Sequence, residues 1–355
     1  MKADRHKRIS IKKKRRYATF KTLMTFMFIL FMVVGSSFVV NKIIITNEIE
    51  NLKNEESDNK DDFYKVINKV SDSIVTISDD KEKLENNVFN EGNVSGIILN
   101  EEGYILTSYK AIKGKDELYI RLSGVANEAV EAKFIGDEEK TDIAVLKISS
   151  NNLIPIKFAD YNEIKIGQKV FAVGNAVSAT PVGMITPGII TSIDEEIVDG
   201  NGNLYKVVET SAITNKKNLG GVLCDYRGKL IGFIGGCSVE SNKENNLSYT
   251  LSVRGVKNIC EYLINLTDIL GINGGNAIDD PITGVKGVYI QNIKKDGYAA
   301  NAGLLPTDII TDIDDKEVET PEDLYYAIKM NKNGDSIKCG FLRDGTKSSV
   351  IINLK

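Results

Sequence analysis

The sequence has no tryptophan and a single histidine, His6, which stands six residues from its start. Imidazole is the side chain whose ordinary pKa suits base catalysis near neutral pH, so chemistry in the rest of the chain has to proceed without it. Cysteine is also scarce, and its four members, Cys224, Cys237, Cys260 and Cys339, form no C-x-x-C pair. Their spacing matches no zinc site, so we expect neither a metal nor a cofactor, and most of these thiols should be buried as small apolar groups. A disulfide between Cys224 and Cys237 is the alternative.

Positive charge is concentrated at the N-terminus. Residues 1–21 hold ten of the 45 lysines and arginines and one of the 49 acids, which leaves 35 basic and 48 acidic residues, a net charge of −13, for the rest. Such an acidic remainder argues against a nucleic-acid partner. The basic head is followed by Leu23–Val40, which is 18 residues long and carries no charge. As a helix this run would extend about 27 Å, close to the roughly 30 Å of a hydrocarbon core.

We therefore expect one N-terminal transmembrane helix, within residues 22–45, that anchors the chain. The positive-inside rule places the basic head, residues 1–21, in the cytoplasm and everything after about residue 46 outside. The predicted topology is that of a single-pass protein of the cell membrane. A cleaved signal peptide is the alternative, although the apolar run is long for one and no A-x-A site follows it. The polar and charged residues 46–62 are interpreted as a linker.

Short runs rich in Val and Ile, separated by Gly, Asn and Asp, dominate residues 63–268. Regular short strands with few helices are typical of sandwiches or closed barrels. GINGGNAIDDP (271–281) is interpreted as a loop-rich boundary, and a smaller unit follows it at 272–355. The predicted fold class is therefore mostly β.

Several segments resemble the high-temperature-requirement (HtrA/Deg) family of trypsin-like serine proteases. In chain order, they resemble the family's segments that carry the base, the orienting acid, the substrate pocket and the nucleophile. The unit at 272–355 looks like a PDZ domain. The segments are GYILTSYKAI (Gly103–Ile112), DEEKTDIAVLKI (Asp137–Ile148), GNAVSATPVGMITPGIITSI (Gly174–Ile193) and SAITNKKNLGGVL (Ser211–Leu223). The resemblance implies a trypsin-like double β-barrel followed by a C-terminal PDZ domain.

The resemblance also assigns the catalytic positions, and most of them are changed. The family's histidine falls on Lys110, its aspartate on Asp142 and its serine on Leu219. In the loop that forms the oxyanion hole, a family glycine falls on Lys217, while Asn218 matches. Leucine has no nucleophilic atom, and a lysine with an ordinary pKa of roughly 10.4 is mostly protonated. Lysine in place of glycine also disfavours the turn that presents oxyanion donors. We therefore expect no active catalytic residues.

Two alternatives concern what these residues do instead. A Ser–Lys dyad could use Lys110 as its base with Ser211, Thr214 or Ser108, although none of these occupies the nucleophile position. A structural arrangement is the other reading, in which Lys110 pairs with Asp142 and Leu219 packs against apolar neighbours.

PDZ domains bind an extended peptide by adding it as a strand to their sheet. By resemblance, Gly287, Val288, Tyr289 and Ile290 form the carboxylate loop and the strand that follows it. The opposite wall would be a helix from about Pro321, with Leu324 and Ile328 facing the groove at i, i+4. Val288, Ile290, Leu324 and Ile328 could instead belong in part to the ordinary core of the domain.

The function favoured by the sequence is a membrane-anchored, HtrA-like pseudoprotease on the extracytoplasmic side. It would bind unfolded or C-terminal peptide segments in envelope protein quality control or regulation. The alternatives are an active serine-type endopeptidase with unorthodox residues, and a structural envelope protein whose PDZ groove is unused. The family implies a homo-trimer as one assembly, and pairing with an active paralogue is another.

Overall fold

The computed structural model forms one compact unit from Tyr64 to Lys355, and the residues before it are a separate unit. Within the part that is described, no helix is long and apolar enough to cross a membrane. The basic head and the linker 46–62 lie outside the described residues, as does most of Leu23–Val40. The described residues are 24, 25, 27, 32, 42, 64–86, 92–122, 128–174, 184–198, 204–236, 247–279, 284–331 and 335–354.

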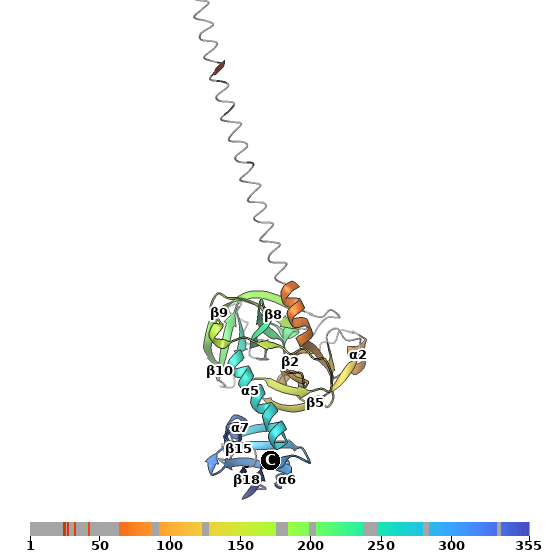
Figure 1. Ribbon diagram of the computed structural model, residues 1–355, viewed down its shortest axis with the longest axis vertical. Helices are drawn as coiled ribbons and strands as arrows, with labels where there is room; N and C mark the ends of the chain where they lie inside the picture. Colours follow the sequence, from red (N-terminus) through yellow and green to blue (C-terminus); the bar gives the residue numbers. More distant parts are fainter. Residues whose placement is uncertain are drawn as a thin grey trace, which may run out of the picture. The chain divides into compact units, whose positions relative to one another are not determined.

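A helix at 64–70 leads into a first, closed barrel of six strands in the order β1-β2-β3-β6-β5-β4 (Figure 1, orange to yellow). Its first three strands are buried along their whole length, so they are continuous apolar runs rather than alternating ones. Two short helices, α2 and α3, and the 3-10 turn η1 interrupt the strands. The elements are η1 (Ser71–Ser73), β1 (Ile74–Ser78), α2 (Lys81–Glu85), β2 (Val94–Ile98), β3 (Tyr104–Ser108), α3 (Tyr109–Ile112), β4 (Leu118–Arg121), β5 (Ala129–Glu138) and β6 (Ile143–Lys147).

A second sheet runs in the order β11-β8-β9-β10-β13-β12, and pairing between β11 and β12 closes it into a second barrel. Strand β7 adds to β12 in parallel. The double barrel expected from the resemblance is therefore present. The elements are β7 (Lys157–Phe158), η2 (Tyr161–Glu163), β8 (Lys169–Gly174), β9 (Met184–Val198), β10 (Leu204–Thr210), η3 (Lys216–Asn218), β11 (Val222–Asp225), β12 (Lys229–Phe233) and β13 (Ser248–Ser252).

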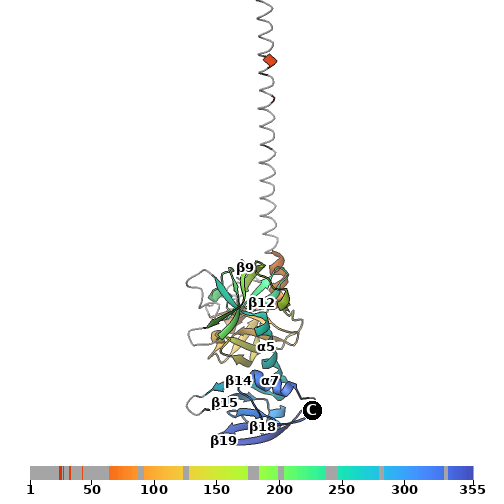
Figure 2. The same cartoon turned by 90° about the vertical axis from the view of Figure 1, so that its left-hand side faces the viewer.

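Helix α5 (Val253–Asn265) follows the second barrel and continues into one π-helical turn, η4 (Leu266–Leu270). The chain then forms the sheet β14-β15-β16-β18-β19, with β17 on β16 (Figure 2). Its helix α7 begins with a capping box between Thr320 and Asp323, because a threonine oxygen accepts a first-turn N–H and an acid returns the bond. The elements are β14 (Ile272–Asp279), β15 (Lys286–Ile293), α6 (Tyr298–Asn301), β16 (Ile309–Ile313), β17 (Lys316–Glu317), α7 (Pro321–Lys329), β18 (Ser336–Arg343) and β19 (Thr346–Asn353).

One prediction about this region is wrong. The stretch from Ile272 to Asp279, interpreted from the sequence as part of a loop-rich boundary, is strand β14. It pairs with β15 along its length, from Ile272 opposite Ile293 to Asp279 opposite Lys286. Two adjacent glycines weaken a strand by propensity, but this tertiary pairing overrides them.

Three of the four cysteines are described. Cys224, Cys260 and Cys339 are buried free thiols, and burial raises the pKa of each of them. This confirms the prediction that most cysteines serve as small apolar groups. Cys237, the predicted alternative partner of Cys224, lies outside the described residues.

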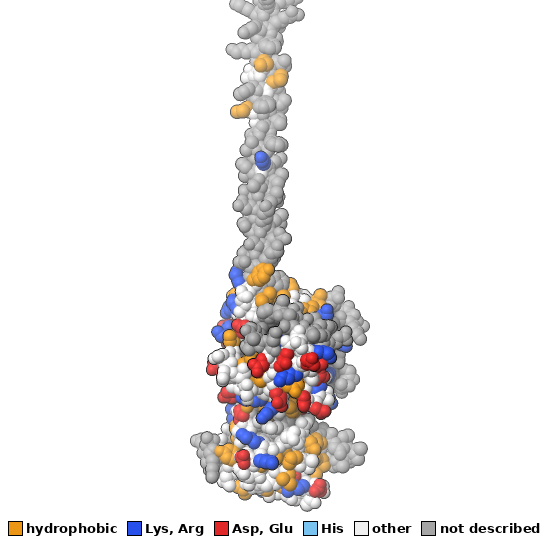
Figure 3. Space-filling model, turned by 90° about the vertical axis from the view of Figure 1, so that its right-hand side faces the viewer, with side chains coloured by type: hydrophobic (Ala, Val, Ile, Leu, Met, Phe, Trp, Pro, Cys, Tyr) orange, Lys and Arg blue, Asp and Glu red, His pale blue; other side chains and the backbone are white. Residues whose placement is uncertain are grey.

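Charges of both signs are mixed on the face seen in Figure 3, where acidic and basic side chains lie next to each other. Among the described side chains on that face, there is no continuous basic patch. A duplex or single strand of nucleic acid is bound mainly through such patches. The expectation that nucleic acid is not a partner stays a prediction.

Candidate functional site

Asp142 lies in the turn between β5 and β6 of the first barrel. Its backbone has φ of 60°, the left-handed region that Asp tolerates better than most residues. Its side chain is 2% exposed, and three donors hold the carboxylate: Ser108 Oγ at 2.7 Å, Lys110 N at 2.6 Å and Gly236 N at 2.5 Å. Burial raises the pKa of Asp142, although these three donors and the nearby Lys110 charge act to lower it. Both oxygens of the Asp142 carboxylate therefore accept hydrogen bonds from neutral donors.

Lys110 stands in α3, next to this carboxylate. Its N–H donates to Asp142 Oδ1, and its side chain is exposed. The ammonium passes over Gly236, where a side chain would come within 3.2 Å of Lys110 Nζ and 3.1 Å of Asp142 Oδ2. A Cβ at position 236 would therefore require one of these groups to shift by a few tenths of an ångström. The structure thus brings Lys110 and Asp142 together, while an ion pair between their side chains stays a prediction.

Leu219 lies in the loop between η3 and β11. Its side chain is half-buried and packs against the core of the first barrel, together with Tyr109 and Ala111. Its carbonyl accepts a hydrogen bond from Ser95 N at 3.0 Å, which ties the loop to β2. The expectation that Leu219 packs against apolar neighbours is confirmed by these contacts.

In the same loop, backbone N–H groups that a catalytic turn would direct toward a substrate form hydrogen bonds within the loop. Asn215 Oδ1 accepts from Lys217 N at 2.8 Å, and Asn215 O accepts from Asn218 N at 3.1 Å. In return Asn218 Oδ1 accepts from Asn215 N at 2.8 Å, which completes a capping box on η3. Lys217 itself is exposed, whereas Asn218 is fully buried. Two N–H groups next to position 219 are therefore already bonded within the turn.

A cleft of about 390 Å³ lies over these residues. Its described lining contains no serine, threonine, cysteine or histidine. Ser108 and Thr214 are buried and are not part of the lining, although the Ser108 hydroxyl donates to Asp142, and Ser211 Oγ accepts a hydrogen bond from Ile189 N. The lining residues are Gly92, Asn93, Val94, Lys110, Ala111, Lys115, Asp142, Lys216, Leu219 and Gly236. The described walls therefore offer cations and apolar surface rather than a nucleophile.

A second buried aspartate, Asp137, lies near the end of β5 and is 2% exposed. Neither of its carboxylate oxygens has a hydrogen-bond partner among the described residues. Burial raises the pKa of Asp137 to about 7, helped by the charges of Glu139 and Glu138 and opposed by Lys113. This carboxyl does not line the cleft, and sequence reasoning gave it no role.

In the PDZ-like unit, the predicted peptide strand is wrong. Gly287, Val288, Tyr289 and Ile290 belong to β15, which is hydrogen-bonded to β14 on one side and to β16 on the other. Ile290, for example, donates to Asp308 O and accepts from Thr307 N. A strand with both edges paired has no free groups for another strand.

Gly287 has a structural reason to be glycine. Its φ is +154°, and a Cβ there would lie 2.3 Å from Ile310 O. Its neighbours Val288 and Ile290 are fully buried, and Tyr289 is half-buried. These residues therefore form part of the core and of the close approach between β15 and β16, as the alternative reading allowed.

The described sheet ends in two edge strands: β14, which pairs only with β15, and β19, which pairs only with β18. Helix α7, β5 and α5 all lie close to β14. Leu324 and Ile328 of α7 are 0% and 3% exposed, so they too are core side chains. On the outside of α7, Tyr325 Oη and Lys329 Nζ both donate to Glu261 Oε1 of α5, at 2.7 and 2.9 Å. Strand β14 therefore has one edge without a strand partner in this sheet.

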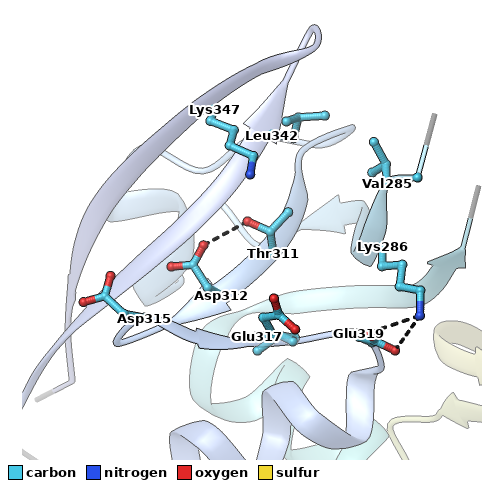
Figure 4. A pocket seen from close by; sticks show the side chains of 11 residues that line it. Val285, Lys286, Thr311, Asp312, Asp315, Glu317, Glu319, Leu342 and Lys347 are labelled. Atoms are coloured by element: carbon cyan, nitrogen blue, oxygen red, sulfur yellow. Dashed lines mark hydrogen bonds and ion pairs between the residues drawn. The ribbon is translucent and has the colours of Figure 1, made fainter.

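A larger cavity of about 580 Å³ lies elsewhere in the same unit (Figure 4). No residue of β14 or α7 lines this cavity, so it is separate from the unpaired edge of β14. Lys286 Nζ meets both oxygens of Glu319 at 3.2 Å, and the Thr311 hydroxyl donates to Asp312 Oδ2 at 3.0 Å (Figure 4). Lys286 and Glu319 thus form an ion pair within the lining, and Asp315 of the lining pairs with Lys338 outside it.

Sequence reasoning missed several residues of the site. Asn215 has a recognisable signal, because an Asn three residues before another Asn can cap a turn. Gly236, Lys115 and Lys216 have none, since only the folded chain brings them to the cleft.

Comparisons with known proteins agree with this architecture. A family model described as "Trypsin-like peptidase domain" matches residues 94–233, and one described as "PDZ domain" matches 238–354. "Serine protease Do-like HtrA" of Lactobacillus helveticus is 30% identical over 294 residues, covering 77% of this chain and 70% of that protein. "Protease Do-like 1, chloroplastic" of Arabidopsis thaliana is 29% identical over 75% of this chain, which spans 64% of its length.

Among solved structures, "HtrA-type protease AlgW with decapeptide" is 23% identical, with a TM-score of 0.47, over 82% of this chain and 97% of that one. The double barrel, the PDZ sheet, both family models and the relative from Lactobacillus helveticus agree with one another. The chain therefore belongs to the HtrA/Deg family of trypsin-like serine proteases with a C-terminal PDZ domain.

Proposed function

We propose that this chain is a catalytically inactive HtrA-family protein that binds peptide segments instead of cutting them. The observation that carries the proposal is the cleft, whose described lining has no hydroxyl, thiol or imidazole. Leu219 occupies the nucleophile position with a hydrocarbon side chain that packs into the barrel core. Acyl transfer requires a nucleophile and a base within hydrogen-bond reach of each other, and neither is present among these residues.

The loop supports the same proposal by an independent route. The N–H groups of Lys217 and Asn218 are bonded to Asn215, so they are not presented to an oxyanion. Removing a single oxyanion donor typically costs roughly 100- to 1000-fold in rate. Loss of nucleophile, base and donors together leaves a frame that can hold a peptide without hydrolysing it.

Activity on an unfolded protein tests the proposal directly. We expect the full-length protein, purified in detergent, to leave fluorescent casein intact and to remain unlabelled by a fluorophosphonate probe. A triple variant, Lys110→His with Lys217→Gly and Leu219→Ser, supplies the missing side chains, and partial casein cleavage by it is the positive arm, because its loop amides can still bond to Asn215. The same triple variant with Asp142→Asn is its control, because the new histidine would lose its orienting acid.

Casein cleavage and probe labelling that stay with the wild-type chain through further purification would contradict inactivity. They would favour the alternative of a working endopeptidase with unorthodox residues. Loss of that activity in Lys110→Ala would then identify Lys110 as the base of a dyad.

Peptide binding by the PDZ domain is the second part of the proposal, and it belongs at β14. A peptide with a free C-terminus should bind more tightly than its amidated form, because PDZ domains capture the terminal carboxylate. Hydrogen–deuterium exchange should then slow within residues 272–279. No binding by any peptide of a C-terminal library would instead favour the structural role with an unused groove.

Location and assembly complete the proposal. Homologues include "Probable periplasmic serine protease do/HhoA-like" of Haemophilus influenzae, which is in keeping with an extracytoplasmic bulk and a role in envelope protein quality control. We propose that Leu23–Val40 anchors the chain in the cell membrane with its N-terminus in the cytoplasm. Release of the full-length protein from membranes by alkaline carbonate would contradict this. Light scattering in detergent distinguishes a homo-trimer from a monomer, and co-purification tests pairing with an active paralogue.

A further inference from the structure

Lysines from three different elements meet at the cleft. Lys110 comes from α3, Lys115 from the turn after it, and Lys216 from η3. Asp142 is the one acid in the described lining, and its two oxygens already accept three hydrogen bonds from Ser108, Lys110 and Gly236. The lining therefore carries more positive than negative charge, and its acid is bonded by the protein itself.

Lys115 is held in place at one wall. Its Nζ lies 3.2 Å from Asp79 Oδ2 and 3.2 Å from Gly92 O, and its side chain is 18% exposed. Even when Asp79 is counted against it, the charges of Lys110 and Lys216 exceed that of Asp142. The ammonium groups of Lys110 in α3 and Lys216 in η3 thus make the electrostatic potential in the cleft positive.

The rest of the cleft is suited to a peptide. Val94, Ala111 and Leu219 supply apolar surface between the lysines. Asn93 Oδ1, also in the wall, is buried without a hydrogen-bond partner, and a peptide N–H is a donor that could satisfy it. A ligand that matches these groups has a carboxylate flanked by apolar atoms and at least one N–H.

We propose that the cleft binds an acidic side chain, Asp or Glu, of an extended peptide whose neighbouring residues are apolar. The inference rests on the proposed function, since it names the class of peptide that the inactive site selects. The carboxylate lies between the ammonium groups of Lys110 and Lys216, and the apolar neighbours contact Leu219 and Ala111. The cleft is thereby selective for acidic peptide sequences.

Fluorescence anisotropy with the full-length protein in detergent tests this proposal. The probe is fluorescein-labelled Ala-Val-Glu-Val-Ala, amidated at its C-terminus so that the PDZ domain has no terminal carboxylate to bind. We expect it to bind about tenfold more tightly than its Gln analogue at low salt, as for two partly exposed ion pairs, and the difference to shrink as salt is added.

Lysine variants locate the binding. Lys110→Gln with Lys216→Gln should weaken binding of the Glu peptide by about tenfold and leave the Gln peptide nearly unaffected. Lys113→Gln with Lys140→Gln is the matched control, because it removes the same charge from exposed positions that do not line the cleft. Circular dichroism of both double variants verifies that each is folded.

Equal binding of the Glu and Gln peptides, or equal weakening by the two double variants, would overturn the proposal.

An unlabelled Ala-Val-Gln-Val-Ala with a free C-terminus tests whether the cleft binds a side-chain carboxylate or a C-terminal carboxylate. If it displaces the Glu probe as well as the unlabelled Glu peptide does, the cleft selects chain ends and the side-chain proposal is wrong. If the free-acid peptide binds with protection of β14 while the Glu probe does not bind, this inference fails and the proposed function stands. If no peptide binds, both fail.

Discussion

The barrel cleft and the PDZ domain each contain a buried aspartate, and the two are stabilised in different ways. Asp308 of the PDZ domain is fully buried and accepts from Arg343 Nε and NH2, both at 2.7 Å, as a two-point ion pair. Asp142 of the cleft is 2% exposed and is held by a hydroxyl and two backbone N–H groups. The Asp308 carboxylate is therefore stabilised by a positive charge in direct contact. The Asp142 carboxylate is stabilised mainly by the dipoles of a hydroxyl and two backbone N–H groups.

This difference indicates what each region does. A guanidinium fork fixes a carboxylate in one geometry, and Asp308 also accepts from Leu305 N, so it orders the turn before β16. Asp142 is held by a hydroxyl and two backbone N–H groups, and burial raises its pKa. The Asp308 carboxylate stabilises a turn of the PDZ domain, whereas the Asp142 carboxylate lines the cleft.

The largest expected effect comes from Asp308→Asn. An amide loses one acceptor and turns an NH2 group toward the Arg343 guanidinium, so we expect a loss of roughly 3 to 5 kcal/mol of stability in the PDZ domain. Hydrogen–deuterium exchange in β16 and β18 measures it. Asp308→Asn combined with Arg343→Met should recover part of the loss. A single variant as protected as the wild type would show that the ion pair does not set PDZ stability.

Asp137 sharpens the comparison because it has neither dipoles nor a direct counter-charge. Its pKa is raised from 3.8 to about 7, so between these values the folded state binds more protons than the unfolded state. Stability should therefore fall as pH rises from about 4 to about 7, by on the order of 2 kcal/mol. Thermal unfolding at pH 5 and pH 8 measures the fall.

We expect Asp137→Asn to remove most of this pH dependence, with the variant more stable than the wild type at pH 8. The groups near Asp137 that also titrate or carry charge are Tyr109, Lys113, Glu138 and Glu139. Glu131→Gln is the control: it is an exposed change on the same strand whose charge is not among those that act on Asp137, and it should keep the slope. A wild-type melting temperature that does not change between pH 5 and pH 8 would rule out a buried, ionising Asp137.

Ser108→Ala tests how far dipoles compensate Asp142. The hydroxyl is fully buried and donates to Asp142 Oδ2, so its removal should cost about 1 kcal/mol at pH 7 and raise the pKa of Asp142 further. Because a protonated carboxyl needs fewer donors, the cost should shrink at pH 4. Urea unfolding followed by circular dichroism at both pH values measures it. A cost that is the same at both would mean that the hydroxyl acts only as the N-cap of α3.

The smallest expected effect is that of Lys110→Met. Its side chain is exposed, and exposed charges contribute little to stability, so the free energy of unfolding should change by about 0.5 kcal/mol or less. Thermal unfolding of this variant beside Lys113→Met, its exposed neighbour, provides the measurement. A loss comparable to that of Asp308→Asn would show that the cleft depends on an ion pair as the PDZ domain does.

Much of the fold could be predicted from the sequence. Apolar runs such as Ile74–Ser78 and Tyr104–Ser108 indicate buried strands, and the packing of Leu219 follows from its side chain. The capping box at Thr320 was likewise readable, since a cap depends only on residues three positions apart. These features are local, and local chemistry decides them.

The remainder depends on which strands become neighbours. The run at 287–290 is apolar on both faces, as expected for an interior strand, but the sequence does not state that 272–279 pairs outside it. Asp137 stands in an acidic stretch typical of an exposed turn, and only its register opposite Ala144 places it inside. Sheet order and register are non-local, so side-chain patterns alone did not predict the peptide edge or this buried acid.

The Asn215–Asn218 capping box has a consequence for protein engineering. Restoring a serine and a histidine would supply reacting atoms to a loop whose N–H groups remain committed to an asparagine. A design that seeks full turnover from this scaffold would also replace Asn215, so that the loop can reorient its amides toward a substrate. If the chain is inactive, as proposed, hydrolysis would therefore require a different loop conformation as well as new side chains.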